Sequence, residues 1–337
     1  MQIITIEEND ANQRLDKFLK KLFINATRAL IYKFNRKSKI KVKQAWEEWF
    51  KKRDNEFKLS VWDEVKLFLS DKDISELSKK PTPNPSLLRM GIEQRFNKKD
   101  IVFEDGDLFV VNKASGTNVH PGDFKSKEVS LIQQVQDYLG EKLNSLTFKP
   151  SLVHRIDRDT SWILLIAKKK DILTKLVADF KNHKKIKKTY LAICFGKLPQ
   201  KSWTITKKLL RIENAKNQNK VQISDQGQTA ISHYKLVEEF SVNTTNWPQN
   251  ISVVEVEIET GRMHQIRVHL ASLKCPIIWD KAYGNKSLNY YFEKEFWVSR
   301  QMLHAYKISF FHYGRKKQLD LMAKLKNDME GFLKKIK

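Results

Sequence analysis

The chain has 337 residues, with 63 lysines and arginines against 39 aspartates and glutamates, and therefore carries a formal net charge of +24 at pH 7. It is 41% hydrophobic, 11% aromatic and 30% charged, which is typical of a globular protein and excludes a disordered one. No apolar run reaches the length of about 18 residues that a transmembrane helix needs, and the start lacks the pattern of a secretory signal. Two cysteines cannot build a disulfide scaffold or a four-ligand zinc site. We therefore expect a cytoplasmic protein of about two domains.

Two features of the composition stand out. Basic residues are locally concentrated, since residues 26–46 hold seven of them and no acidic residue, which favours nucleic-acid binding over a general lysine bias. Glycine is scarce, with 11 residues against a usual share of about 7%, whereas tryptophan occurs eight times. The concentration of basic residues indicates a nucleic-acid partner. The glycine and tryptophan counts bear on which residues stand at individual positions.

The N-terminal part predicts a small basic domain. Apolar residues in 12–23 recur at helical spacing, and Thr27 is placed to cap a second helix. Residues 39–43 alternate like a strand, and residues 59–69 are typical of a strand pair. A helix–helix–strand unit with basic residues outside is a design that binds RNA, although an ordinary α+β domain with a charged surface has the same pattern. Three prolines in residues 79–86 indicate a linker.

The remaining chain mixes strands and helices without regular alternation. We expect two strands in residues 101–112 joined by a turn at Asp105–Gly106, a buried strand over 163–167 and a helix over 171–183. Residues 254–258 alternate valine and isoleucine with glutamate, as a half-buried strand does. This order favours an α+β fold over a doubly wound parallel sheet.

Three segments carry chemistry. HRIDRDTS at 154–161 offers two aspartates, Asp157 and Asp159, beside arginines that favour the ionised carboxylate. Such a carboxylate suits a nucleophile or base, but the same residues are also typical of a salt bridge in a loop. KTYLA at 188–192 places a tyrosine in a strand, where packing is the commoner role and base stacking the functional one.

The third segment, ETGRMHQIRVHLA at 259–271, supplies several hydrogen-bond donors. Its two histidines, His264 and His269, are five residues apart and would lie on different faces of a helix, so we expect no metal site there. His154 to Asp157 superficially resembles a kinase catalytic loop, but the glycine-rich loop and the Asp-Phe-Gly motif of a kinase do not occur.

Taken together, these segments resemble the RluA family of RNA pseudouridine synthases. HRIDRDTS resembles its catalytic motif, KTYLA its tyrosine motif and ETGRMHQIRVHLA its arginine motif. RQMLHAY at 300–306 and residues 101–122 resemble further parts of its catalytic domain. Residues 12–70 resemble the S-four-type RNA-binding module that many members carry. The likeness spans nearly the whole chain with the motifs in order, which is more specific than any single motif.

The resemblance implies a role for each motif. Asp157 would be the catalytic aspartate, Arg267 would pair with it and keep it ionised, and Tyr190 would stack on the uracil and remove the final proton. Arg155 would enter the RNA stack at the position of a flipped-out uridine. Further RNA contacts are expected from residues of the arginine motif and of the N-terminal module, namely His264, Gln265, Arg14, Arg28, Lys33 and Arg36.

The resemblance also implies the organisation and partners of the protein. We expect an S-four-like module over 1–75, a linker over 76–98 and a catalytic domain over 99–330 with a mixed, largely antiparallel sheet. The substrate would be RNA, with large-subunit ribosomal RNA preferred to transfer RNA, and we expect a monomer with no cofactor, no metal and no membrane partner. Two rival interpretations are an RNA-binding homologue that has lost catalysis and, less favoured, a metal-dependent nucleic-acid hydrolase.

Tryptophan stands where similar chains usually have glycine. This holds at Trp62, Trp162, Trp203 and Trp279, and we extend it to Trp297. Glycine serves where φ is positive or where a backbone approaches closely, and tryptophan fits neither need. Some bacterial lineages read the codon UGA as glycine, and a gene from such a lineage translated with UGA as tryptophan would show this pattern. If the tryptophans are real instead, those at 162 and 279 predict a blocked or altered site.

Overall fold

The computed structural model describes residues 1–79, 96–120, 129–140, 145–154, 160–182, 185–213, 219–244 and 247–337. The chain forms two compact units. One consists of residues 1–96, 133–150 and 168–171, and the other of residues 97–132, 151–167 and 172–337. Among the described helices, none is long and apolar enough to cross a membrane.

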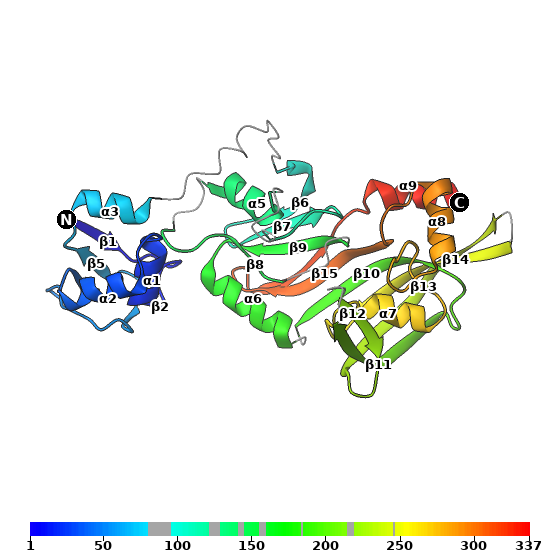
Figure 1. The fold of residues 1–337 in the computed structure, drawn as a ribbon, viewed down its shortest axis with the longest axis horizontal. Coiled ribbons are helices and arrows are strands. Elements are labelled where there is room, and N and C mark those ends of the chain that lie inside the picture. The colour runs from blue at the N-terminus through cyan, green and yellow to red at the C-terminus, as the bar shows by residue number, and fades with distance from the viewer. Residues whose placement is uncertain are drawn as a thin grey trace. The chain divides into compact units, whose positions relative to one another are not determined.

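The N-terminal part of the first unit is a three-stranded antiparallel sheet packed against helices (Figure 1). Its strands follow the order β1 (Gln2–Thr5), β5 (Glu64–Leu67) and β3 (Ile40–Lys43), and its helices are α1 (Leu15–Leu22), α2 (Arg28–Arg36) and α3 (Asp71–Ser78). The apolar face expected for residues 12–23 is confirmed, because Leu15, Phe18 and Leu19 are fully buried. Thr27 caps α2 as expected, since its side chain accepts a hydrogen bond from the amide of Leu30 at 3.2 Å.

One expectation for this unit is wrong. Residues 59–69 do not form a strand pair, because β4 (Lys58–Leu59) pairs with β2 (Gln13–Arg14) in a separate two-stranded sheet. β5 instead lies between β1 and β3. Val65 and Leu67 of β5 lie in the same apolar core as Ile40 and Val42 of β3, and Leu59 of β4 reaches that core from the separate sheet.

The second unit is built on one eleven-stranded sheet, which confirms the mixed, largely antiparallel α+β fold. Its strands run in the order β12-β11-β13-β14-β10-β15-β9-β7-β6, with β16 on β15 and β8 on β9. All the pairs are antiparallel except β9 with β15. The strand bounds are β6 (Ile101–Glu104), β7 (Leu108–Lys113), β8 (Ser151–Leu152), β9 (Ser161–Ala167), β10 (Ile186–Phe195), β11 (Ser202–Glu213), β12 (Asn219–Ile223), β13 (Gln228–Thr244), β14 (Trp247–Ile258), β15 (Leu303–His312) and β16 (Lys317–Met322).

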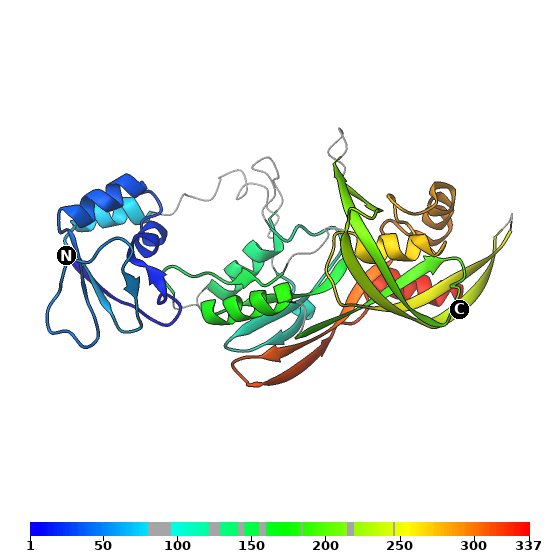
Figure 2. The same ribbon diagram turned by 90° about the horizontal axis from the view of Figure 1, so that it is seen from below.

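The chain after the N-terminal part also contains helices. Those of the remaining chain are the short 3-10 helix Lys98–Asp100, α5 (Leu131–Leu139), α6 (Lys170–Asn182), α7 (Gln265–Ser272), α8 (Lys286–Phe296) and α9 (Asn327–Ile336). Figure 1 and Figure 2 show α7 against the β11–β13 end of the sheet, and α8 and α9 pack on each other through Phe292, Phe296 and Phe332. The expected strands and helix of this region are confirmed, and every residue of β9 is buried. The middle strands β9, β10 and β15 position the site described next.

Candidate active site

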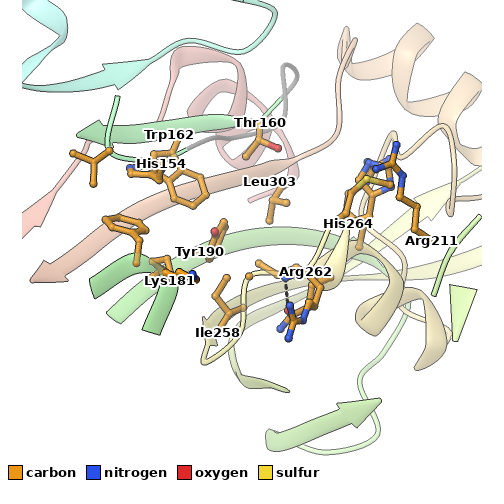
Figure 3. Close-up of a pocket in the computed structure, with 18 of the residues that line it drawn as sticks. His154, Thr160, Trp162, Lys181, Tyr190, Arg211, Ile258, Arg262, His264 and Leu303 are labelled. Carbon is orange, nitrogen blue, oxygen red and sulfur yellow. Dashed lines mark hydrogen bonds between the residues drawn. The ribbon is translucent and has the colours of Figure 1, made fainter. Parts of the chain in front are cut away.

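A pocket of about 790 Å³ opens where the middle of the sheet meets the segment that leads into α7. One side is aromatic, with His154, Trp162 and Tyr190 near one another (Figure 3). The other side includes His264 and Arg211. The described lining residues carry basic side chains at Lys181, Lys188, Arg211, Arg262 and Arg267, and none of them is acidic. This combination suits an anionic ligand that also offers a flat ring.

Tyr190 is positioned by β10, a strand held on both sides. It lies opposite Val256 of β14 and Ala305 of β15, and the register with β15 shifts between Thr189 and Tyr190. Its side chain is only 6% exposed and meets the Trp162 ring edge-on at a centroid distance of 4.8 Å. A tyrosine fixed in this way is preorganised to face a ring bound in the pocket.

Lys188 lines the same pocket and was not among the residues expected there. Its ammonium group lies over the ring of Phe180, 5.7 Å from the centroid. Burial lowers the pKa of Lys188 to about 8, because a charged amine is disfavoured away from water. The signal was present in the sequence, since Lys188 opens the KTYLA motif two residues before Tyr190, but only the fold shows that both side chains line the pocket.

Arg267 is held by a buried carboxylate. Its Nε donates to Asp280 Oδ2 at 2.6 Å and its Nη2 donates to Asp280 Oδ1 at 2.7 Å. Asp280 is fully buried, and its Oδ1 also accepts hydrogen bonds from the amides of Ala282 and Tyr283. The Arg267 guanidinium lies over the Tyr283 ring, 5.1 Å from the centroid. This two-point contact fixes the orientation of the guanidinium in the pocket wall.

The segment before α7 is held by Gln265, which is 3% exposed. Its Oε1 accepts from the hydroxyl of Thr260 at 2.7 Å and from the amide of Arg262 at 3.1 Å. Its Nε2 donates to Ile231 O and to Ser232 Oγ, both at 2.9 Å. The amide of Gln265 is therefore used within the protein, where it ties the arginine motif to β13.

His264 is the N-cap residue of α7 and has the left-handed conformation, with φ 53° and ψ 18°. Its Nδ1 is 2.9 Å from the hydroxyl of Tyr283, which accepts a hydrogen bond from the amide of Val221. The ring lines the pocket, and its expected RNA contact stays a prediction. The left-handed backbone at His264 turns the chain from the segment after β14 into α7.

The other expected site residues divide into two groups. Asp157 and Arg155 lie outside the described residues, whereas their sequence neighbours His154 and Thr160 both line the pocket. In the N-terminal module, Arg28, Lys33 and Arg36 are exposed on α2, and Arg14 is bound to Asp16 and Glu56 at 2.9 Å each. The last four therefore belong to the N-terminal unit, and their RNA contacts stay a prediction.

One group among the described residues has spacing that fits a metal ion: Asp105, Asp107 and His312. Asp105 already pairs with His312 at 3.1 Å and with Arg315 at 2.8 Å. The three residues are not among those that line the pocket. The Asp105 carboxylate is therefore accounted for by ion pairs within the protein.

Comparison with known proteins identifies the family of the chain. The family described as RNA pseudouridylate synthase matches residues 107–272, which include the tyrosine and arginine motifs. The ribosomal large subunit pseudouridine synthase C of Buchnera aphidicola subsp. Baizongia pistaciae is 34% identical over 99% of this chain and 96% of its own length. The protein of the same name from Vibrio cholerae is 32% identical over 100% of this chain and 97% of its own length.

Solved structures show the same fold. Human RNA pseudouridylate synthase domain containing 4 superposes with a TM-score of 0.55 and 21% identity, covering 71% of this chain and 93% of that one. Human RNA pseudouridylate synthase domain containing 1 gives a TM-score of 0.53 and 23% identity, covering 67% of this chain and 83% of that one. The full-length relatives, the matched motifs and the pocket agree, and this chain therefore belongs to the RNA pseudouridine synthase family as an isomerase that acts on RNA.

Proposed function

We propose that the protein converts specific uridines of large-subunit ribosomal RNA to pseudouridine. The observation that carries this proposal is that Tyr190 and Arg267, from two separate motifs, line one basic pocket in a chain that matches synthases of the large ribosomal subunit along its whole length. RNA brings phosphates to the basic side chains and a flat base to the aromatic ones.

The reaction is an isomerisation, so no atom has to be supplied. The bond between N1 of uracil and C1′ of the ribose breaks, the uracil turns, and a bond forms between C5 and C1′. The proton on C5 is removed and N1 gains a proton. No oxidant, reductant or group donor is needed, which agrees with the expectation that the protein uses no cofactor. The protein has to extrude the base, stabilise the broken state and move one proton.

We assign these tasks to the three motif residues. Asp157 either attacks the ribose or removes a proton from it to release the uracil, and Arg267 keeps this aspartate ionised. Tyr190 stacks on the freed ring and removes the C5 proton. The location of His154 and Thr160 in the pocket wall supports this assignment, because they belong to the motif that contains Asp157. Gln265 acts as a positioning residue, since its amide is bound within the protein.

RNA binding extends beyond the pocket in this proposal. Arg155 fills the gap that the flipped uridine leaves, and His264 contacts the RNA at the pocket edge. Arg14, Arg28, Lys33 and Arg36 of an S-four-like module over residues 1–75 contact phosphates, followed by a linker over 76–98 and a catalytic domain over 99–330. The protein works as a monomer in the cytoplasm, where its ribosomal RNA substrate is found, and light scattering of the purified protein tests the monomer.

The test is a product map. Unmodified large-subunit ribosomal RNA and a transfer RNA pool are incubated with the protein, and pseudouridines are located by carbodiimide labelling and reverse transcription. We expect new pseudouridines in the ribosomal RNA, none with Asp157→Asn, and product with the matched control Asp159→Asn. Product only in transfer RNA would overturn the substrate, and product with Asp157→Asn would overturn that residue's role. RNA binding without any product would support the impaired homologue instead.

A further inference from the structure

Three tryptophans have the backbone conformation of glycine. Trp62, Trp279 and Trp297 have φ values of 71°, 62° and 62°, in the left-handed region. Among the described residues only two glycines, Gly116 and Gly196, have positive φ, so tryptophan occupies this region more often than glycine does. We propose that residues 62, 279 and 297 are glycine in the protein that its own cell makes.

Positions 62 and 279 are the third residues of two equivalent turns. The amide of Asp63 donates to Ser60 O at 3.3 Å, and the amide of Asp280 donates to Ile277 O at 3.2 Å. In each turn the third residue has positive φ and the second does not, which is the type II pattern and calls for glycine at the third position. Each turn is followed by a fully buried aspartate.

Position 297 ends a helix. It directly follows α8, with φ 62° and ψ 30°, and its amide donates to Glu293 O at 3.1 Å. This is the left-handed C-terminal cap, in which glycine is the usual residue because it has no Cβ to clash with the backbone. Two turns and one helix end thus demand glycine for independent local reasons.

The three indole side chains differ in exposure, and that of Trp279 has the Lys281 ammonium over its ring, 4.1 Å from the centroid. Those of Trp62 and Trp297 are 67% and 82% exposed. The indole of Trp279 is buried, and its Nε1 has no hydrogen-bond partner in the part of the chain that the structure describes. The other five non-glycine residues with positive φ are all polar: Asn12, Ser38, His264, Lys274 and Lys316. A large aromatic residue in this region is a backbone outlier.

Position 279 matters for the site as well. Its turn carries Asp280, which holds Arg267 in the pocket wall at 2.6 and 2.7 Å. A glycine there lets the turn form without strain and so places the carboxylate that fixes the guanidinium. Part of the tryptophan excess and a small part of the glycine shortage then have one cause, a codon such as UGA that the cell reads as glycine.

The same reassignment at position 162 would open the pocket, a step that rests on the proposed function. The Trp162 ring lies 4.8 Å from the Tyr190 ring and 5.3 Å from the His154 ring, in the space where a uracil would stack on Tyr190. Its Nε1 is buried without a hydrogen-bond partner among the described residues. Trp203 differs, because it is an exposed residue in the ordinary strand β11, where the structure gives no reason to prefer glycine.

The direct test is the mass of peptides from the protein isolated from its own cells, read beside the gene's codons. We expect glycine at 62, 279 and 297, with UGA codons there. Tryptophan in these native peptides, encoded by UGG, would overturn the proposal.

A second test uses the recombinant chain and compares glycine with alanine at each position. Both remove the indole, and only glycine is free of the penalty for positive φ, so glycine variants should melt about 2–4 °C above the matching alanine variants. The matched control is Trp49, which is 75% exposed and lies outside the left-handed region, so Trp49→Gly should melt no higher than Trp49→Ala. Alanine as stable as glycine at 62, 279 and 297 would contradict the geometric argument.

The pocket step has its own readout. Trp162→Gly should raise the initial rate of pseudouridine formation at least about tenfold, because the space beside the Tyr190 ring becomes free for the uracil; this corresponds to a barrier lower by about 1.4 kcal/mol. If native peptides carry glycine at 162 but the parent chain and Trp162→Gly form pseudouridine at equal rates, the proposed role of the space beside Tyr190 is overturned. Native glycine at 162 with no product from either form would leave the residue identity standing and overturn the proposed function instead.

Discussion

Asp280 links the arginine motif to a turn thirteen residues further along the chain. It is fully buried and gives both carboxylate oxygens to Arg267. A buried pair of this kind contributes little net stability, but the loss of one partner leaves an uncompensated charge and costs about 3–5 kcal/mol. We infer that its value to the protein is the orientation of Arg267, which makes Asp280 a positioning residue.

Asp280→Asn should therefore reduce turnover more than binding. The amide keeps the shape of the side chain but no longer holds Arg267 by charge, and a displacement of about 1 Å at a catalytic group costs about 10²-fold in rate. The measurement is the single-turnover rate of pseudouridine formation against RNA concentration, corrected for the folded fraction. We expect a lower maximal rate, a nearly unchanged half-saturating RNA concentration, and a pH–rate profile shifted to higher pH as the catalytic carboxylate becomes harder to ionise.

The matched control is Asp328→Asn. Asp328 also binds an arginine through two hydrogen bonds, to Arg300 at 2.5 and 2.9 Å, and the guanidinium lowers its pKa despite burial. It is not among the described residues that line the pocket. This variant should lose stability while its pH–rate profile stays in place. Equal effects of both variants on the rate and the profile would show that Asp280 acts only through stability.

Helix α2 carries the exposed basic residues that we propose contact RNA. Its apolar residue Ile31 is buried in the core, and Arg28, Lys33 and Arg36 are exposed. The Thr27 cap fixes where the helix begins and therefore which residues face outward. Each phosphate contact that an exposed cation makes releases counterions, so its loss is visible in the salt dependence of binding.

Replacing Arg28, Lys33 and Arg36 together with alanine should lower the slope of log affinity against log salt by about 2–3, at about 0.7–0.9 per phosphate contact. The measurement is RNA binding by fluorescence anisotropy over a series of salt concentrations. A control variant removes the same charge from exposed positions of the other unit, Lys317, Lys334 and Lys335. If both variants reduce the slope equally, the effect is net charge and α2 makes no specific phosphate contacts.

Several elements were predictable from sequence because their signal is local. The apolar spacing in α1, the Thr27 cap, and the alternation of Val254 and Val256 with Glu255 each reflect neighbours along the chain. Burial of one face decides them, and one face can be read from periodicity. The family motifs likewise named Tyr190 and Arg267, both of which line the pocket.

The rest depends on contacts between distant segments. Nothing in the sequence pairs β4 with β2, because two-residue strands carry no period. The bond from Arg267 to Asp280 exists only because the turn at 277–280 brings the carboxylate back to α7. Gln265 looked like an RNA-binding donor, and only tertiary structure shows its amide bound to Thr260 and Ile231. The hydrogen-bond partners of such side chains are set by the fold and cannot be read from the motif.

At the scale of the whole molecule, a strongly positive protein also contains buried neutral histidines. His269 and His304 are both fully buried, and neither Nε2 has a hydrogen-bond partner among the described residues. Burial lowers the pKa of each to about 4, helped by Lys207 for His269 and by Arg300 for His304. In the unfolded chain both titrate near pH 6.5.

Stability should therefore fall as the pH drops from 6.5 towards 4. In that window the unfolded state binds protons that the folded state does not, so the free energy of unfolding rises with pH and levels off above about 6.5. Each histidine accounts for about 2 kcal/mol of loss at pH 5. Urea unfolding between pH 5 and 7.5 measures this, and the double variant His269→Gln, His304→Gln should show a shallower dependence whatever its absolute stability. A double variant as steep as the parent would assign the acid sensitivity to other groups, such as repulsion within the +24 charge.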